Sequence, residues 1–121
     1  SVNAQNQFNQ NNILKAEEAF ILNAHLTDNV INASWQIAAE HYLYKNSIKV
    51  IINNEAIAHE FILLDESVIN DEFFGESLVL QNTLVVRAVY NSTNLQNAII
   101  TIEYQGCAAG KYCYPKQQQN I

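Results

Sequence analysis

The sequence predicts an all-β fold, an antiparallel β-sandwich, from three observations. Apolar and polar residues alternate over short runs, which is typical of strands with one buried face. Turn-forming residues such as Asn, Asp and Gly separate these runs, and no stretch shows the period of a long helix. The chain has 121 residues, of which 49% are hydrophobic, so it can bury a core of its own. We therefore expect about eight short strands in one domain.

The first half of the chain shows the alternation most clearly. One helical turn is expected at residues 16–19, and it is too short to be stable alone. A strand is expected at residues 20–26, followed by a turn at residues 27–29. Residues 31–37 alternate cleanly between apolar and polar side chains, which predicts a half-buried strand with Trp35 anchored in the core.

The second half continues the pattern up to a polar tail. The expected elements are strands at residues 42–44, 48–52 and 61–64, a turn at 53–54, two strands at 77–80 and 83–90 joined at 81–82, a polar loop at 91–97, and a strand at 98–104. Residues 1–12 are polar and without a signal-peptide pattern, so a disordered start of a mature or excised segment is expected. The domain then covers residues 13–116, and residues 117–121 are expected to be a polar tail or the start of a linker.

The charge balance excludes two classes of partner. Twelve acidic residues against six basic ones give a net charge of −6. Nucleic acids and anionic membrane surfaces are bound by basic patches, so neither is expected here. No apolar run approaches the length that a membrane-spanning helix needs.

The stretch that carries chemistry is residues 104–115. It holds both cysteines, two of the three glycines and the only proline of the chain. A zinc site needs four closely spaced ligands, and the histidines His25, His41 and His59 show no such spacing, so they are expected at the surface without a chemical role. No metal is expected.

Two roles remain for Cys107 and Cys113. A structural disulfide would close a short loop and contribute roughly 2 to 2.5 kcal/mol in the chain-entropy treatment, less than a long loop gives. A reversible redox pair would exchange disulfides through thiolate attack, which needs an accessible sulfur and control of access. Tyr112 and Tyr114 flank Cys113, while Lys111 would favour a thiolate. Acids at 71 and 72 would disfavour a thiolate if they lie nearby.

A second segment, residues 70–76, breaks the strand pattern with acids, Phe73, Phe74 and Gly75. Adjacent side chains in a strand point to opposite faces, so one Phe can be exposed. Two interpretations stay open: a loop with one Phe buried in the core, or a flap whose exposed Phe covers another site.

Three motifs resemble the N-terminal periplasmic domain of the bacterial thiol:disulfide interchange protein DsbD. The most specific is Tyr-Gln-Gly-Cys-Ala at residues 104–108 with Cys-Tyr-Pro at 113–115, since five residues separate the cysteines as in that family. Asp-Glu-Phe-Phe-Gly at 71–75 is similar to the family's cap loop, and residues 35–37 with 42–45 form the third match. The resemblance runs from about residue 16 to 116. Ala109, Gly110 and Lys111 depart from the family loop, which leaves that loop's shape open.

The resemblance implies an immunoglobulin-like fold and a relay of electrons. Cys113 would form the mixed disulfide, and Cys107 would resolve it. Phe73 would shield the pair from within a cap loop, and no cofactor is implied. Tyr42 and Tyr44 match family positions near the pair, and the alternative is that they are strand aromatics packed on a sheet. The members of the implied cap loop are Asp71, Glu72, Phe73, Phe74 and Gly75.

The implied partners are periplasmic. Electrons would come from a thioredoxin-like C-terminal domain of the same inner-membrane protein. They would pass to a disulfide isomerase and to a thioredoxin-like protein of cytochrome c maturation. The alternative is a non-catalytic immunoglobulin-like binding module with a structural disulfide, which the Asn-X-Ser/Thr sequons at residues 32–34 and 91–93 would suit.

Overall fold

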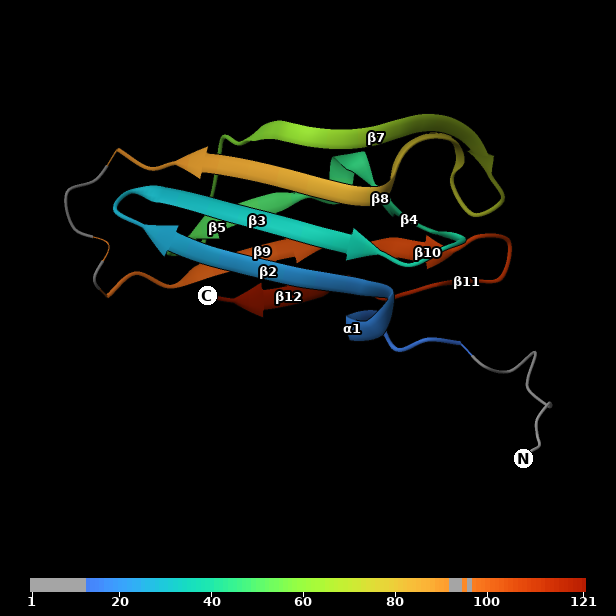
Figure 1. Cartoon of the computed structure of the whole chain (residues 1–121), viewed down its shortest axis with the longest axis horizontal. Coiled ribbons are helices and arrows are strands. Elements are labelled where there is room, and N and C mark those ends of the chain that lie inside the picture. Colours follow the sequence, from blue (N-terminus) through green and yellow to red (C-terminus); the bar gives the residue numbers. More distant parts are fainter. Residues whose placement is uncertain (1–12, 92–94, 96) are drawn as a thin grey trace.

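Two antiparallel sheets form the fold in the computed structural model, which describes residues 13–91, 95 and 97–121. The larger sheet has seven strands in the order β11-β10-β4-β8-β3-β2, with β7 paired to β8, and the smaller has four in the order β12-β9-β5-β6. The predicted β-sandwich is confirmed (Figure 1). The elements are α1 (Ala16–Ala19), β2 (Phe20–Thr27), β3 (Val30–Ile37), β4 (His41–Tyr44), a 3-10 turn η1 (Lys45–Ser47), β5 (Lys49–Ile52), β6 (Glu55–Ile57), β7 (Glu60–Asp71), β8 (Gly75–Val89), β9 (Ile100–Tyr104), β10 (Gly106–Ala108), β11 (Tyr112–Cys113) and β12 (Gln117–Asn120).

The core lies between the sheets and is centred on Trp35, which is fully buried as predicted. Its ring meets Tyr104 of the opposite sheet edge-on, with ring centroids 5.6 Å apart. The alternation in β3 follows from this packing, because every second side chain of that strand is buried. Burying one large apolar side chain stabilises the fold by roughly 1.5 to 3 kcal/mol. Apolar residues are therefore favoured on the strand faces that point into the core, which is the alternation seen in the sequence.

Three expected elements differ in the structure. Residues 77–80 and 83–90 do not form two strands, because β8 runs unbroken from Gly75 to Val89. Asn82 takes a positive φ of 66° inside it, a conformation that Asn tolerates, so the expected turn is only an irregularity of one strand. The short run at 61–64 is part of β7, which extends to Asp71.

The end of the chain also differs. Residues 117–120 were expected to be a polar tail or linker, yet they form β12 against β9. β12 is an edge strand of the smaller sheet. Backbone pairing with β9 holds it there, so its side chains can be polar and face solvent. The expected disorder at 1–12 lies outside the described residues, as does most of the polar loop at 91–97.

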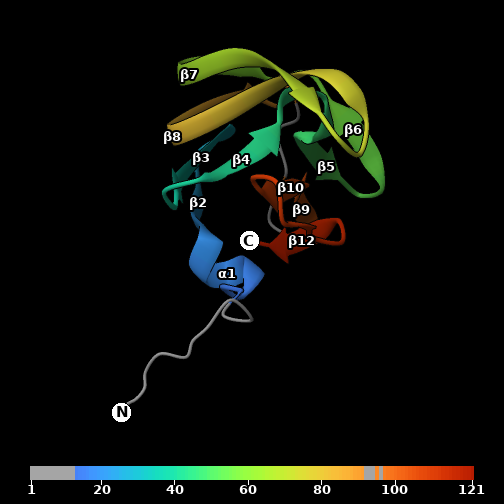
Figure 2. The same ribbon diagram turned by 90° about the vertical axis from the view of Figure 1, so that its right-hand side faces the viewer.

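Two hairpin turns lie at the same end of the sandwich. The turn between β7 and β8 and the turn between β10 and β11 project from the right-hand end in Figure 1, and Figure 2 looks onto that end. β4 joins the two hairpins, since it pairs with β10 on one side and with β8 on the other. This shared strand places the cysteine hairpin next to the segment that the sequence singled out as a flap.

Candidate functional site

The two cysteines form a disulfide across the small hairpin of β10 and β11. Cys107 lies directly opposite Cys113 in the strand register, with Cα atoms 4.0 Å apart. Cys107 is fully buried, whereas Cys113 is half-buried. Gly110 makes the connecting turn with a positive φ of 69°, which glycine adopts without strain. One sulfur of the bond is therefore more accessible than the other.

Gly106 lets this hairpin lie close to the large sheet. A Cβ atom at this position would collide with the backbone oxygen of Tyr42 and lie 2.7 Å from Phe20 Cζ. Only glycine leaves space for β10 to pair with β4 at this distance. The glycine before Cys107 thus fixes the position of the buried sulfur relative to β4.

Tyr44 connects the disulfide to a buried carboxylate. Its hydroxyl oxygen lies 3.0 Å from Cys107 Sγ and 3.5 Å from Cys113 Sγ. The same hydroxyl donates to Asp71 Oδ2 at 2.7 Å, and Tyr42 donates its hydroxyl proton to that oxygen as well. A hydroxyl has one proton and an ionised carboxylate only accepts, so the lone pairs of the Tyr44 oxygen face the sulfurs.

The electrostatics of the site favour a charged Asp71 between neutral phenols. Burial and the hydrogen bond to Asp71 raise the pKa of Tyr42 to about 12, and the same two causes raise the pKa of Tyr44. Burial alone would raise the pKa of Asp71, which is 4% exposed. Hydrogen bonds from the two tyrosines and from two backbone N–H groups outweigh burial and lower that pKa. A buried negative charge thus lies beside the disulfide.

Asp71 also shapes the turn between β7 and β8 that follows it. Its Oδ1 accepts hydrogen bonds from the backbone N–H groups of Phe73 at 2.6 Å and Phe74 at 2.9 Å. This is the local pattern by which an Asp side chain stabilises a turn. Gly75 completes the turn with a φ of 78°. The expected cap segment is therefore a tight turn held by the same carboxylate that meets both tyrosines.

Both phenylalanines of the turn are exposed. Phe73 is 46% and Phe74 is 63% exposed, so the reading that tucks one of them into the core is wrong. The Phe74 ring stands edge-on to Tyr44, with centroids 5.1 Å apart. The turn therefore contacts the tyrosine pair through Phe74.

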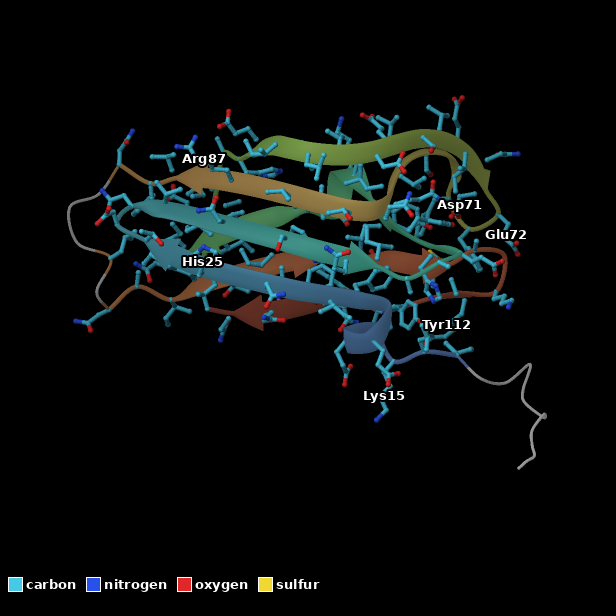
Figure 3. All side chains as sticks on the ribbon, in the orientation of Figure 1. Lys15, His25, Asp71, Glu72, Arg87 and Tyr112 are labelled. Carbon is cyan, nitrogen blue, oxygen red and sulfur yellow. A yellow bond between two sulfur atoms is a disulfide. The ribbon has the colours of Figure 1, made fainter. Side chains whose placement is uncertain are left out.

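The two turns approach each other at this end of the molecule. Figure 3 shows Asp71 and Glu72 at the end where the cysteine hairpin lies, with Tyr112 below them and Arg87 at the far end. A Cβ atom on Gly110 would lie 4.0 Å from a Glu72 carboxylate oxygen. The β7–β8 turn therefore borders the loop between the cysteines.

The remaining sequence-predicted residues take structural positions. Tyr112 is 38% exposed and its ring meets Tyr114 edge-on. Tyr114 is buried and donates its hydroxyl to the backbone oxygen of Leu14 at 2.6 Å. Of the histidines, His25 is exposed. His41 and His59 are partly exposed at the surface: His41 lies edge-on to Phe20, and His59 lies edge-on to Phe61.

Two features of the site were not visible in the sequence. Asp71 accepts four hydrogen bonds, two from the backbone of its own turn and two from Tyr42 and Tyr44, and the tyrosine bonds depend on contacts between strands distant in sequence. A groove of about 770 Å³ beside the turn is lined by Tyr44, Phe74, Val68, Leu78 and Gln105 among others. The only signal in the sequence was that β7 and β8 carry apolar residues on positions that face outward, such as Val68 and Leu78, which are 60% and 39% exposed.

A family model described as the N-terminal part of the thiol:disulfide interchange protein DsbD matches residues 10–121. The match contains the disulfide, the tyrosine pair and the turn just described. This chain belongs to the DsbD N-terminal domain family. Within that family the chain is 30% identical to the DsbD of Yersinia pestis strain Pestoides F over 112 residues and 33% identical to that of Photorhabdus laumondii over 112 residues. These alignments cover 93% of the chain in both cases.

Solved structures agree with the DsbD assignment. The reduced N-terminal domain of DsbD from Neisseria meningitidis superposes with a TM-score of 0.80 at 27% identity, covering 94% of this chain and 91% of the other. The complex of the Neisseria meningitidis DsbD and PilB N-terminal domains matches with a TM-score of 0.65 at 26% identity, covering 92% and 88%. The immunoglobulin-like sandwich expected from the resemblance is confirmed.

The chain spans only about a fifth of the length of the curated DsbD relatives, 18% and 19% for the two named above. Within the described residues, no helix is long and apolar enough to cross a membrane. The family and the paired cysteines support thiol–disulfide chemistry in general terms.

Proposed function

We propose that this chain is the periplasmic relay domain of a membrane-bound DsbD-type protein. It receives electrons from a thioredoxin-like domain of the same protein and reduces disulfides of periplasmic partners through Cys107 and Cys113. The observation that carries this proposal is the unequal access to the two sulfurs. Cys113 is half-buried at the rim, while Cys107 is buried beside Tyr44.

The exchange follows from this asymmetry. A thiolate of the donor attacks Cys113 Sγ, the Cys107–Cys113 bond breaks, and the electron pair stays on Cys107, which takes up a proton. The second donor thiol then releases the donor as a disulfide, leaving two thiols in this domain. In the forward transfer the Cys113 thiolate attacks the partner's disulfide, and the Cys107 thiolate resolves the resulting mixed disulfide.

The surface around Cys113 suits a protein partner. Exposed Phe74 lines the groove described above, exposed Phe73 precedes it in the same turn, and aromatic side chains are frequent in protein interfaces. In Neisseria meningitidis the related domain forms a complex with the PilB N-terminal domain. For this chain we propose partners with a thioredoxin-like fold, including a disulfide isomerase and a protein of cytochrome c maturation.

The decisive experiment is the redox potential of the cysteine pair. The purified domain is equilibrated with mixtures of oxidised and reduced dithiothreitol, and the reduced fraction is measured by alkylation. A relay disulfide should have a potential well above about −300 mV, the upper limit typical of structural disulfides. A value below that limit would instead support a binding module with a structural disulfide.

A further inference from the structure

The disulfide and Asp71 place three potential metal ligands together. The two sulfurs and a carboxylate oxygen of Asp71 all lie within 4.8 Å of one another. The sequence offered no such site, because Asp71 is far from the cysteines along the chain and the histidines are scattered. In the disulfide the sulfurs hold no metal, since the thiolate is the ligand form.

We propose that the reduced domain binds a zinc-type divalent cation through Cys107, Cys113 and Asp71. This proposal rests on the proposed function in one respect, that the disulfide is reduced during turnover. Thiolate sulfur binds zinc at about 2.3 Å and carboxylate oxygen at about 2.0 to 2.2 Å, so a tetrahedral ion brings these ligands to within about 4 Å of each other. On reduction the two sulfurs, bonded to each other in the disulfide, must move apart to reach that spacing, while the Asp71 oxygen, within 4.8 Å of both, needs only a small approach.

The charge balance is favourable. Reduction yields two thiols, and binding of the cation releases their two protons while Asp71 is already ionised. Two thiolates and one carboxylate then surround the divalent ion with a net charge of −1. Soft thiolate ligands select zinc over magnesium or calcium. The acidic surface of a chain with net charge −6 also attracts cations.

The surroundings provide support and access. Two backbone N–H groups hold Asp71 Oδ1, which orients the carboxylate as hydrogen bonds do around many metal ligands. Half-buried Cys113 gives the ion a route from solvent. The Tyr44 hydroxyl occupies the space between Asp71 Oδ2 and Cys107 Sγ, at 2.7 and 3.0 Å. It therefore moves aside for a water ligand or becomes the fourth ligand itself.

Bound zinc would regulate the relay, because both thiols are then ligands and neither attacks a partner. The domain would transfer electrons when zinc is scarce and keep its thiols protected when zinc is abundant. This consequence distinguishes a metal site from an incidental cluster, since it predicts competition between zinc and thiol reagents.

The test uses the reduced domain, freed of reductant, and zinc ions alone. Calorimetric titration should show one ion per reduced chain and no binding by the oxidised chain. Asp71→Asn should weaken binding by at least about tenfold, as loss of a ligand or its support commonly does. The control is Glu76→Gln, which removes an exposed carboxylate just beyond the turn. It should leave the zinc affinity within roughly twofold of wild type, because an exposed surface charge contributes little to binding. Zinc should also slow alkylation of the wild-type thiols.

Equal affinity of wild type and Asp71→Asn would overturn the proposal, as would equal binding by the oxidised chain. The carboxyl-carbon resonance of Asp71 in the reduced wild-type domain gives a check without any variant, and it must move when zinc is added. Electron transfer to a partner is measured separately with a chelator present. Failure there refutes the proposed relay, whereas intact transfer without zinc binding refutes only the metal site.

Discussion

The hydroxyl oxygen of Tyr44 lies 3.0 Å from the sulfur of Cys107, the buried half of the disulfide. In the oxidised domain its proton is held by Asp71, 2.7 Å away. When Cys107 leaves as a thiolate, rotation of this hydroxyl can turn the proton toward the sulfur. We therefore expect Tyr44 to stabilise the charge that develops on the leaving group.

Replacing Tyr44 by Phe should slow reduction of the disulfide while the ring contact with Phe74 remains. Loss of one hydrogen bond of about 1 to 1.4 kcal/mol corresponds to a rate lower by about fivefold to tenfold. The measurement is the rate of reduction by dithiothreitol. Tyr42→Phe is the matched control, because the Tyr42 hydroxyl also donates to Asp71. An equal loss of rate in both variants would show that the contact between Tyr44 and the sulfur has no kinetic role.

The two cysteine substitutions should have different effects. Cys113→Ser should abolish mixed-disulfide formation with a thioredoxin-like partner, because the accessible sulfur is gone. Cys107→Ser should trap the mixed disulfide, because no resolving thiol remains. Non-reducing gel electrophoresis after mixing with an oxidised partner gives the answer. Normal transfer by both single variants would mean that the pair is not the redox centre.

The phenylalanines of the β7–β8 turn should act as a cover. Phe73→Ala should raise the rate of reduction by dithiothreitol, a small reagent that gains nothing from partner contacts. Its free energy of unfolding should change by less than about 1 kcal/mol, because the ring is 46% exposed. Phe74→Ala tests the contact with Tyr44 in the same way. If neither variant is reduced faster at matched thermal stability, the turn is only a connection.

Asp71 should make the fold sensitive to acid. Its folded-state pKa is lowered from the ordinary value of 3.8, so the unfolded chain binds the proton more readily. The stability that this charge contributes is present above about pH 4 and is lost as the pH falls through the folded-state value. In urea unfolding, the difference between wild type and Asp71→Asn should be largest near neutral pH and should close in acid. Asp65→Asn, at an exposed position, is the control. A difference that is constant with pH would contradict this account.

Gly106→Ala should destabilise the cysteine hairpin. The added methyl group would meet the Tyr42 backbone oxygen and would lie 2.7 Å from Phe20 Cζ. Overpacking of this kind costs about 1 to 3 kcal/mol, and a backbone neighbour cannot move aside easily. Gly75→Ala is the comparison, since no atom lies within 4 Å of its added methyl group and only its φ of 78° opposes the change, at about 1 to 2 kcal/mol. A smaller loss of stability for Gly106→Ala than for Gly75→Ala would be incompatible with this packing.

The sequence predicted strands best where burial alternates along a single segment. β3 and β5 were expected within one or two residues of their observed ends, because each has one face on the core. The break expected at 81–82 was wrong, since pairing of β8 with β7 keeps the strand continuous through the positive φ of Asn82. β12 was missed because a strand of Gln and Asn residues has no apolar pattern, and its pairing with β9 is the only signal.

By itself, the sequence determined the sandwich, the family motifs around the two cysteines and the turn that borders them, because alternation and short motifs are local properties of the chain. Only the tertiary structure decided how these parts meet. Tyr44 and Asp71 are 27 residues apart, and Tyr44 and Cys107 are 63 apart. They come together because β4 pairs with β10 on one side and with β8 on the other, and β8 pairs with β7, which ends at Asp71. A shift of one residue between β4 and β10 would turn Tyr44 away from the sulfur. Such registers are set by packing across the whole sheet, which no local pattern contains.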